Sequence, residues 1–158
     1  MAGSYPANRP IIMDIIREVN PESILDIGVG TGYYGEMIRR DFPNILLDGV
    51  ETFDYSNYRW NCYNNIIRDD IRLINVKEYE LFLMIDVIEH MRVDEGLELL
   101  LRLKGPVLVS TPWYFPQNAD ENPLQEHVSS WTLEDFSSYR YTNYSNYLSL
   151  IILVERKV

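Results

Sequence analysis

Three glycines spaced by two follow a short apolar segment near the N-terminus, in the sequence L-D-I-G-V-G-T-G at residues 25–32. The apolar residues before the glycines are typical of a parallel strand that is covered on both faces. The glycines permit positive φ and a close approach of the backbone to a ligand. Tyr34, Met37 and Ile38 then recur at i, i+3 and i+4, which predicts a helix directly after the loop. A strand, a glycine loop and a helix in this order predict an α/β fold with a ligand site at the loop.

The rest of the chain alternates strand and helix patterns. Apolar runs predict strands at residues 45–50, 66–67, 81–85, 107–110 and 148–154. Helical periodicity covers 10–20, ahead of the first strand, and 93–101, which Gly105-Pro106 closes. Alternating aromatic and polar residues from Tyr139, followed by turn residues at 143–146, predict a hairpin with the last strand. We expect one domain over 1–158, flexible over 1–9, with a doubly wound, mostly parallel seven-stranded sheet that ends in an antiparallel hairpin.

Charge and composition limit the partners. Lys and Arg total 14 against 24 Asp and Glu, a net charge of -10, which disfavours binding to nucleic acid because no basic stripe offsets it. The single cysteine, Cys62, excludes an internal disulfide and fits a reducing cytoplasm. The N-terminus lacks the apolar core of a signal peptide, and the longest apolar run is too short to span a bilayer. These features predict a cytoplasmic protein that does not enter a membrane.

An acid beside the glycine loop bears on the ligand. Asp26 precedes the first glycine by two residues, and a carboxylate there repels a phosphate but suits a cationic ligand with a free amino group. Gly30, Gly32 and Gly35 also satisfy G-x-G-x-x-G, and Glu51 follows about 20 residues later, as a dinucleotide site requires. Both interpretations stay open on this motif alone, with Asp26 favouring the cationic ligand.

Motifs at later strand ends extend the comparison. The third strand runs into I-I-R-D-D-I at 66–71, and the fourth runs into L-F-L-M-I-D-V-I-E-H-M at 81–91. With the glycine loop, these motifs resemble the class I S-adenosylmethionine-dependent methyltransferases. An S-T-P strand end, an N-P turn and H-x-S-x-W within 110–131 resemble a small subgroup of unassigned substrate. The resemblance implies the methyltransferase fold, S-adenosylmethionine as cofactor, and methyl transfer to a small-molecule or saccharide-like acceptor.

The resemblance also implies a role for residues at four strand ends. It places the ammonium of the methionine moiety near Asp26 and the glycines, and the ribose hydroxyls on Glu51. The adenine would lie between the segments that follow the second and third strands, and the methyl group beside the end of the fourth strand. Asp69 stands where the family usually has glycine, so the choice between Asp69 and Asp70 for the adenine amino group stays open. The predicted cofactor-binding residues are Asp26, Gly28, Gly30, Gly32, Glu51, Thr52, Phe53, Asp70, Ile71, Asp86 and Val87.

The acceptor is expected at a long segment without periodic structure, 111–130, because such loops are commonly binding loops. The aromatic run 113–115 either lines an apolar or sugar-like pocket or packs on the core. The sulfonium is already activated, so the protein must supply alignment, exclusion of water and, for an oxygen or nitrogen acceptor, a base. His127 is the candidate base, with pinning of the loop as its other interpretation, and Asp86 is expected to border the reacting carbon.

Three further hypotheses concern the function. In the first, Asp86, Glu89 and His90 have i, i+3, i+4 spacing, and with His127 they resemble the metal-dependent small-RNA 3′-terminal ribose 2′-O-methyltransferases. Two carboxylates and two imidazoles suit Mg²⁺ or Mn²⁺. That family normally has Glu in place of Asp86 and needs an RNA surface, which the net charge disfavours, so we predict no metal site. Glu89 and His90 are instead interpreted as helix-entry residues. The second hypothesis is a non-catalytic S-adenosylmethionine-binding module, and the third is a nicotinamide reductase.

Overall fold

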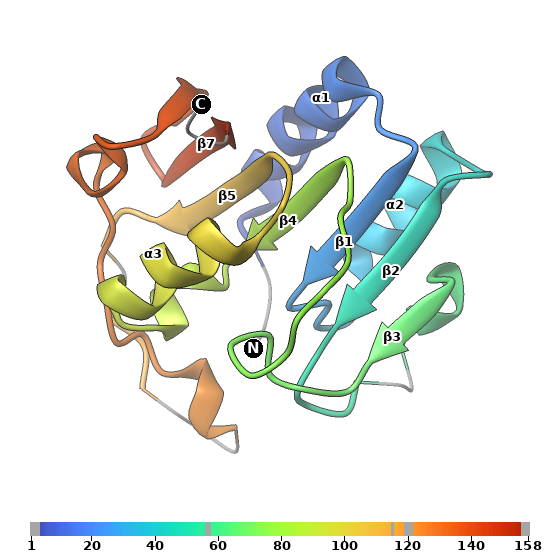
Figure 1. Ribbon diagram of the computed structural model, residues 1–158, viewed down its shortest axis with the longest axis horizontal. Helices are drawn as coiled ribbons and strands as arrows, with labels where there is room; N and C mark the ends of the chain where they lie inside the picture. Colours follow the sequence, from blue (N-terminus) through green and yellow to red (C-terminus); the bar gives the residue numbers. More distant parts are fainter. Residues whose placement is uncertain (1–3, 56–57, 115, 119–121, 156–158) are drawn as a thin grey trace.

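A seven-stranded sheet in the order β3-β2-β1-β4-β5-β7-β6 forms the centre of the protein (Figure 1). The computed structural model describes residues 4–55, 58–114, 116–118 and 122–155. The five parallel strands are β1 (Ser23–Ile27), β2 (Leu46–Val50), β3 (Asn65–Ile67), β4 (Leu81–Ile85) and β5 (Val107–Pro112). The terminal hairpin consists of β6 (Arg140–Asn143) and β7 (Ser149–Glu155), and β7 runs antiparallel to β5. The predicted mostly parallel sheet with its C-terminal hairpin is confirmed.

Helices cover both faces of the sheet. α1 (Arg9–Val19) and α2 (Tyr33–Asp41) lie behind the sheet in Figure 1, and α3 (Val93–Arg102) lies in front of it. Short 3-10 helices complete the chain: η1 (Pro6–Asn8), η2 (Trp60–Cys62), η3 (Ile88–His90), η4 (Pro123–Gln125) and η5 (Leu133–Phe136). Helices on both faces make this the doubly wound arrangement that the sequence predicts.

The buried strands direct alternate side chains into two hydrophobic cores. In β1, Leu25 and Ile27 belong to the core under α3, while Ile24 belongs to the core under α1 and α2. β4 follows the same rule, with all five of its side chains buried. This period of two explains why these strands are continuous apolar runs in the sequence. Asp26 therefore faces the α1 and α2 side, inside the protein.

The N-terminal segment from residue 4 onward packs on the fold, although the sequence predicts flexibility over 1–9. Asn8 is buried, and its amide nitrogen donates to the Ser149 hydroxyl at 2.8 Å. Its amide oxygen accepts from the side chain of Asn146 at 2.8 Å. These bonds tie the start of α1 to the terminal hairpin. Residues 1–3 of the predicted flexible stretch lie outside the described residues.

None of the helices in the described ranges is long and apolar enough to cross a membrane.

Candidate functional site

A cavity of about 840 Å³ lies at the carboxyl ends of β1, β2 and β4. In an open α/β sheet this edge is where ligands bind. The cavity is surrounded by the N-terminal segment, the glycine loop, the segments after β2, β3 and β4, and the long loop after β5. Eight of the eleven predicted cofactor residues line it, namely Gly28, Gly30, Glu51, Thr52, Asp70, Ile71, Asp86 and Val87.

The glycine loop turns sharply at the end of β1. Gly28 has φ of 78°, and a Cβ there would lie 2.4 Å from Cγ2 of Val87, the residue after Asp86. Gly30 has φ of 53°, and a Cβ there would meet only the Gly28 carbonyl oxygen, in van der Waals contact at 4.0 Å. The first glycine is thus required by packing, while the second leaves room for a ligand against the backbone. Gly32 does not line the cavity.

Glu51, the residue after β2, joins the second strand to the glycine loop. Its Oε2 accepts a hydrogen bond from the backbone N–H of Gly30 at 2.7 Å. Its Oε1 accepts from the backbone N–H of Phe53 at 2.9 Å. A carboxylate has about four lone-pair sites, so Glu51 can still accept from a ligand diol while it holds the loop. The acid predicted for ribose lies beside the glycine loop at the cavity wall.

Asp26 lies behind the cavity wall and does not line it. Its side chain is buried, and Oδ2 accepts a 2.5 Å hydrogen bond from the hydroxyl of Tyr63. Burial raises the pKa of Asp26 to about 6, although the Tyr63 hydrogen bond opposes this rise. The expected direct contact with an ammonium is therefore absent from the geometry. Alternation along β1 directs this carboxylate toward Tyr63, beneath the glycine loop.

Two acids follow β3 at the far wall. Asp69 and Asp70 both line the cavity, so the geometry brings both candidates for the adenine amino group to it. Asp70 accepts hydrogen bonds of 2.7 and 3.0 Å from the guanidinium of Arg72, and this pairing lowers its pKa. One carboxylate oxygen of Asp69 accepts a hydrogen bond from the Asp70 backbone N–H at 2.7 Å. Phe53, predicted to flank the adenine, is 38% exposed and does not line the cavity.

Asp86 occupies a strained position at the end of β4. Its φ is 53°, which is uncommon for a residue other than glycine, and its backbone N–H donates to the Ser110 carbonyl at 2.8 Å. Its Oδ1 is buried and has no hydrogen-bond partner in the described part of the chain. Burial raises the pKa of Asp86 to about 7. Strain and an unpaired carboxylate at a cavity wall are typical of a ligand-binding position.

The H-x-S-x-W motif fastens the long loop to η3. The backbone N–H groups of Val128 and Ser129 donate to the Glu89 carbonyl at 2.9 and 3.2 Å. The Ser129 hydroxyl donates to the Met91 carbonyl at 2.7 Å and accepts from the indole of the fully buried Trp131 at 2.8 Å. These contacts fix the position of the preceding residue, His127, at the cavity.

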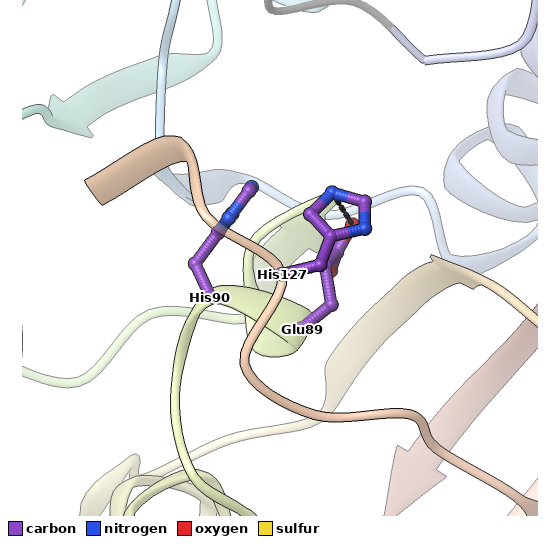
Figure 2. Close-up of side chains that lie close together, drawn as sticks. All are labelled: Glu89, His90 and His127. Atoms are coloured by element: carbon purple, nitrogen blue, oxygen red, sulfur yellow. Dashed lines mark ion pairs between the residues drawn. The ribbon is translucent and has the colours of Figure 1, made fainter. Parts of the chain in front are cut away.

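Glu89, His90 and His127 come together at the cavity, where η3 meets the long loop after β5 (Figure 2). One ligand atom from each lies within 4.8 Å of the others, and His127 Nε2 lies 4.0 Å from Glu89 Oε1. Glu89 is only 1% exposed, and neither of its carboxylate oxygens has a hydrogen-bond partner among the residues described. Burial, followed by the charge of Asp86, raises the pKa of Glu89 to about 8.

The imidazole of His90 is oriented by the loop. Its Nδ1 lies 2.9 Å from the Glu126 carbonyl, which can only accept a hydrogen bond, so Nδ1 carries a proton. Burial lowers the pKa of His90 and favours the neutral ring. Glu89 and His90, interpreted from the sequence as helix-entry capping and packing residues, lie in η3, while the capping box of α3, which begins at Val93, comes from Glu95. The three side chains could instead hold a proton or a divalent cation.

Several lining residues were not predicted from the sequence. Arg9 and Tyr34 approach from the N-terminal side, and Gln117 and Asn122 approach from the long loop. Arg9 lies in the stretch expected to be flexible, and the loop residues have no periodicity to mark them. The aromatic run contributes less than expected. Trp113 packs against the core, Tyr114 is 76% exposed, and neither lines the cavity, while position 115 lies outside the described residues.

Comparison with known proteins shows the fold. No protein-family model matches the chain, and no curated protein matches it. An O-methyltransferase family protein from Burkholderia thailandensis superposes with a TM-score of 0.69 at 13% identity, over 96% of this chain and 56% of that one. Human N-acetylserotonin methyltransferase in complex with SAM gives 0.65 at 13% identity, over 96% and 52%.

A third structure has a length close to that of this chain. The methyltransferase domain of bacterial CtHen1-C gives a TM-score of 0.66 at 16% identity, over 94% of this chain and 96% of that domain. The chain spans only about half the length of the two O-methyltransferases. The strand order, the antiparallel β7 beside β5 and these superpositions show that the chain has the class I methyltransferase fold.

Proposed function

We propose that this protein is an S-adenosylmethionine-dependent methyltransferase that acts on a small-molecule or saccharide-like acceptor. The fold supports the proposal, and one of its structural neighbours is a complex with SAM that is named for a small-molecule acceptor. The cavity at the carboxyl ends of the strands is large enough for a ligand of drug size. A cytoplasmic location stays a prediction.

The contact between the Gly30 backbone N–H and Glu51 carries this proposal. It joins the glycine loop to the acid after β2, and both Gly30 and Glu51 line the cavity. In the proposed complex, Glu51 accepts from the ribose hydroxyls and Thr52 lies near the adenine. Asp70 or Asp69, with the Ile71 amide, meets the adenine amino group. Asp86 and Val87 border the methionine moiety, while Gly32 and Asp26 support the loop from behind.

The transfer is a displacement at carbon. The acceptor atom forms a bond to the methyl carbon as the carbon–sulfur bond breaks, and the electron pair of that bond stays on sulfur to give S-adenosylhomocysteine. The proton of an acceptor hydroxyl passes to a base, for which we propose His127 because it lies at the cavity beside Glu89. Asp86 is proposed to hold the cofactor's cationic end beside the reacting carbon.

Calorimetry on the purified chain tests the proposed cofactor. We expect micromolar binding of S-adenosylhomocysteine and no binding of NAD. Glu51→Gln should weaken the former at least tenfold, about 1.4 kcal/mol, because an amide no longer accepts from both ribose hydroxyls. Glu98→Gln, on the exposed surface of α3, is the matched control and should not change affinity. Binding of NAD instead, or equal affinity in Glu51→Gln, would overturn the proposal.

The Glu89, His90 and His127 cluster favours a second candidate, metal-dependent 2′-O-methyl transfer to a terminal ribose. Neither oxygen of the buried Glu89 carboxylate has a hydrogen-bond partner in the described ranges, and one ligand atom each from Glu89, His90 and His127 lies within 4.8 Å of the others. Two imidazoles and a carboxylate suit a divalent ion such as Mn²⁺, which could polarise a hydroxyl in place of a base. In this candidate His127 is a ligand and not the base.

Divalent cations separate the two candidates. Under the first, methyl transfer continues in the presence of a chelator, and His127→Ala lowers the turnover of the small acceptor. Under the second, Mn²⁺ stimulates methylation of RNA 3′ ends, and His90→Ala abolishes both Mn²⁺ binding and the stimulation. Asn64→Ala, a polar residue remote from the cavity lining, is the control for general effects.

A further inference from the structure

Arg9 is the first residue of α1, and its side chain lines the cavity. The guanidinium carbon lies 3.9 Å from the centroid of the Tyr33 ring, in cation–π contact. Its Nε is buried and has no hydrogen-bond partner in the part of the chain that the structure describes. An unpaired buried donor on a permanently charged group is costly, so this position is expected to have an anionic partner when a ligand is present.

The surrounding charges distinguish Arg9 from the other arginine of the cavity. Arg72 is paired with Asp70 at 2.7 Å and lies 3.5 Å from Glu95. Arg9 forms no ion pair with any described residue, although carboxylates line much of the cavity wall. Of the two described arginines that line the cavity, Arg9 is therefore the one whose guanidinium forms no ion pair with a described carboxylate.

Neighbouring contacts hold Arg9 in place before any ligand arrives. The preceding residue, Asn8, is fixed by its hydrogen bonds to Ser149 and Asn146. The Tyr33 ring, which also lines the cavity, holds the guanidinium in cation–π contact. A side chain ordered in advance loses little conformational entropy on binding, which favours a specific ion pair.

Arg9 and Asp86 lie at the same end of the cavity. Asn8, the residue before Arg9, bonds to Ser149, which pairs with Pro112 at the carboxyl end of β5, and the Asp86 backbone N–H donates to the Ser110 carbonyl of the same strand. Glu51 and Asp70 follow β2 and β3, on the other side of β1 from β4 and Asp86. One end of the cavity thus offers a carboxylate oxygen of Asp86 and a guanidinium nitrogen of Arg9 that have no hydrogen-bond partner among the described residues, the complement of an amino acid zwitterion.

We propose that Arg9 binds the carboxylate at the methionine end of the cofactor, in a bidentate pair, while Asp86 takes the neighbouring ammonium. This inference rests on the proposed function and adds a positioning residue to it. A planar guanidinium matches a carboxylate in geometry as well as in charge. Fixing that end of the molecule also fixes the sulfur, and with it the direction in which the methyl group points.

Two ligands test this assignment without any knowledge of the acceptor. S-adenosylhomocysteine carries the amino acid group, and 5′-methylthioadenosine lacks it but keeps the adenosine and the sulfur. In calorimetry, Arg9→Gln should lower the affinity for S-adenosylhomocysteine at least tenfold and change the affinity for methylthioadenosine less than twofold. Arg9→Lys should restore part of the lost affinity, because a lysine keeps the charge but not the bidentate geometry. Arg59→Gln is the control, since Arg59 contacts the same Tyr33 ring but pairs with Glu36.

The outcomes separate this inference from the proposed function. Binding of neither ligand to the wild-type chain would overturn the proposed function. Normal wild-type binding with unchanged S-adenosylhomocysteine affinity in Arg9→Gln would overturn the role of Arg9 alone. An equal loss for both ligands would also overturn it, because it would mean a general effect on the cavity. The unchanged methylthioadenosine affinity serves as the measure that the variant is folded.

Discussion

At the scale of single residues, the hydrogen bond between Asp26 and Tyr63 separates a structural acid from a ligand-binding one. The motif predicts a carboxylate at this place, and the structure puts it beneath the loop instead of in the cavity. The sequence could not show this, because the partner is Tyr63, 37 residues away in the chain. The role of Glu51 was easier to predict, since its spacing from the glycines is a local property of a strand, loop, helix and strand unit.

Asp26 should make stability depend on pH. Its pKa rises from 3.8 to about 6 on folding, so the folded state binds the proton more tightly than the unfolded state. This contribution is fully present below the unfolded pKa of 3.8 and is lost as the pH rises through about 6. Urea unfolding should show that the free energy of unfolding of wild type falls by roughly 3 kcal/mol, relative to that of Asp26→Asn, as the pH rises through this interval. Parallel curves for the two proteins would contradict this account of Asp26.

At the scale of elements, the long loop after β5 is the part that sequence periodicity describes least. The strands and helices were predictable because buried strands repeat every two residues and covered helices about every 3.6. The loop instead depends on single contacts, such as the Trp131 indole N–H to the Ile88 carbonyl at 3.1 Å. A motif of the form H-x-S-x-W marked the loop as significant, but only the contacts with η3 explain the spacing.

Docking of this loop should depend on the Trp131 indole. Trp131→Phe removes both hydrogen bonds of the indole and leaves the Ile88 carbonyl and the Ser129 hydroxyl without that donor. We expect a loss of about 1–3 kcal/mol of stability and faster hydrogen exchange at the Val128 and Ser129 amides. S-adenosylhomocysteine affinity should change little, because the indole does not line the cavity. Unchanged exchange at these two amides would show that other contacts fasten the loop.

At the scale of the whole molecule, the order of the sequence patterns predicted an α/β sheet with a terminal hairpin, and the resemblance to the class I methyltransferases supplied the rest of the topology. The set of residues that line the cavity could not be predicted in this way. Residues 9, 51, 86 and 127 are far apart in the chain and line one cavity only because the parallel strands end at the same edge. The comparison structures share this architecture, and two of them have about twice the length. The lining residues on the acceptor side of the cavity were the hardest to predict, because they come from a loop whose course follows no sequence period.

Net charge gives a prediction for the whole molecule. At a net charge of -10, the chain should not bind a short RNA at physiological salt, because the excess of Asp and Glu repels phosphates. Fluorescence anisotropy with a labelled RNA, with and without Mn²⁺, measures this directly. Saturable binding that requires Mn²⁺ and is lost in His90→Ala would contradict the prediction and favour the second candidate function.

A crystal structure of the complex with S-adenosylhomocysteine is the most direct measurement of the central claim. We predict density in the cavity with the ribose on Glu51, the adenine beside the segment after β3, and the carboxylate paired with the Arg9 guanidinium. Density for the ligand at any other edge of the sheet, or an inverted molecule with its adenine beside Arg9, would contradict the account.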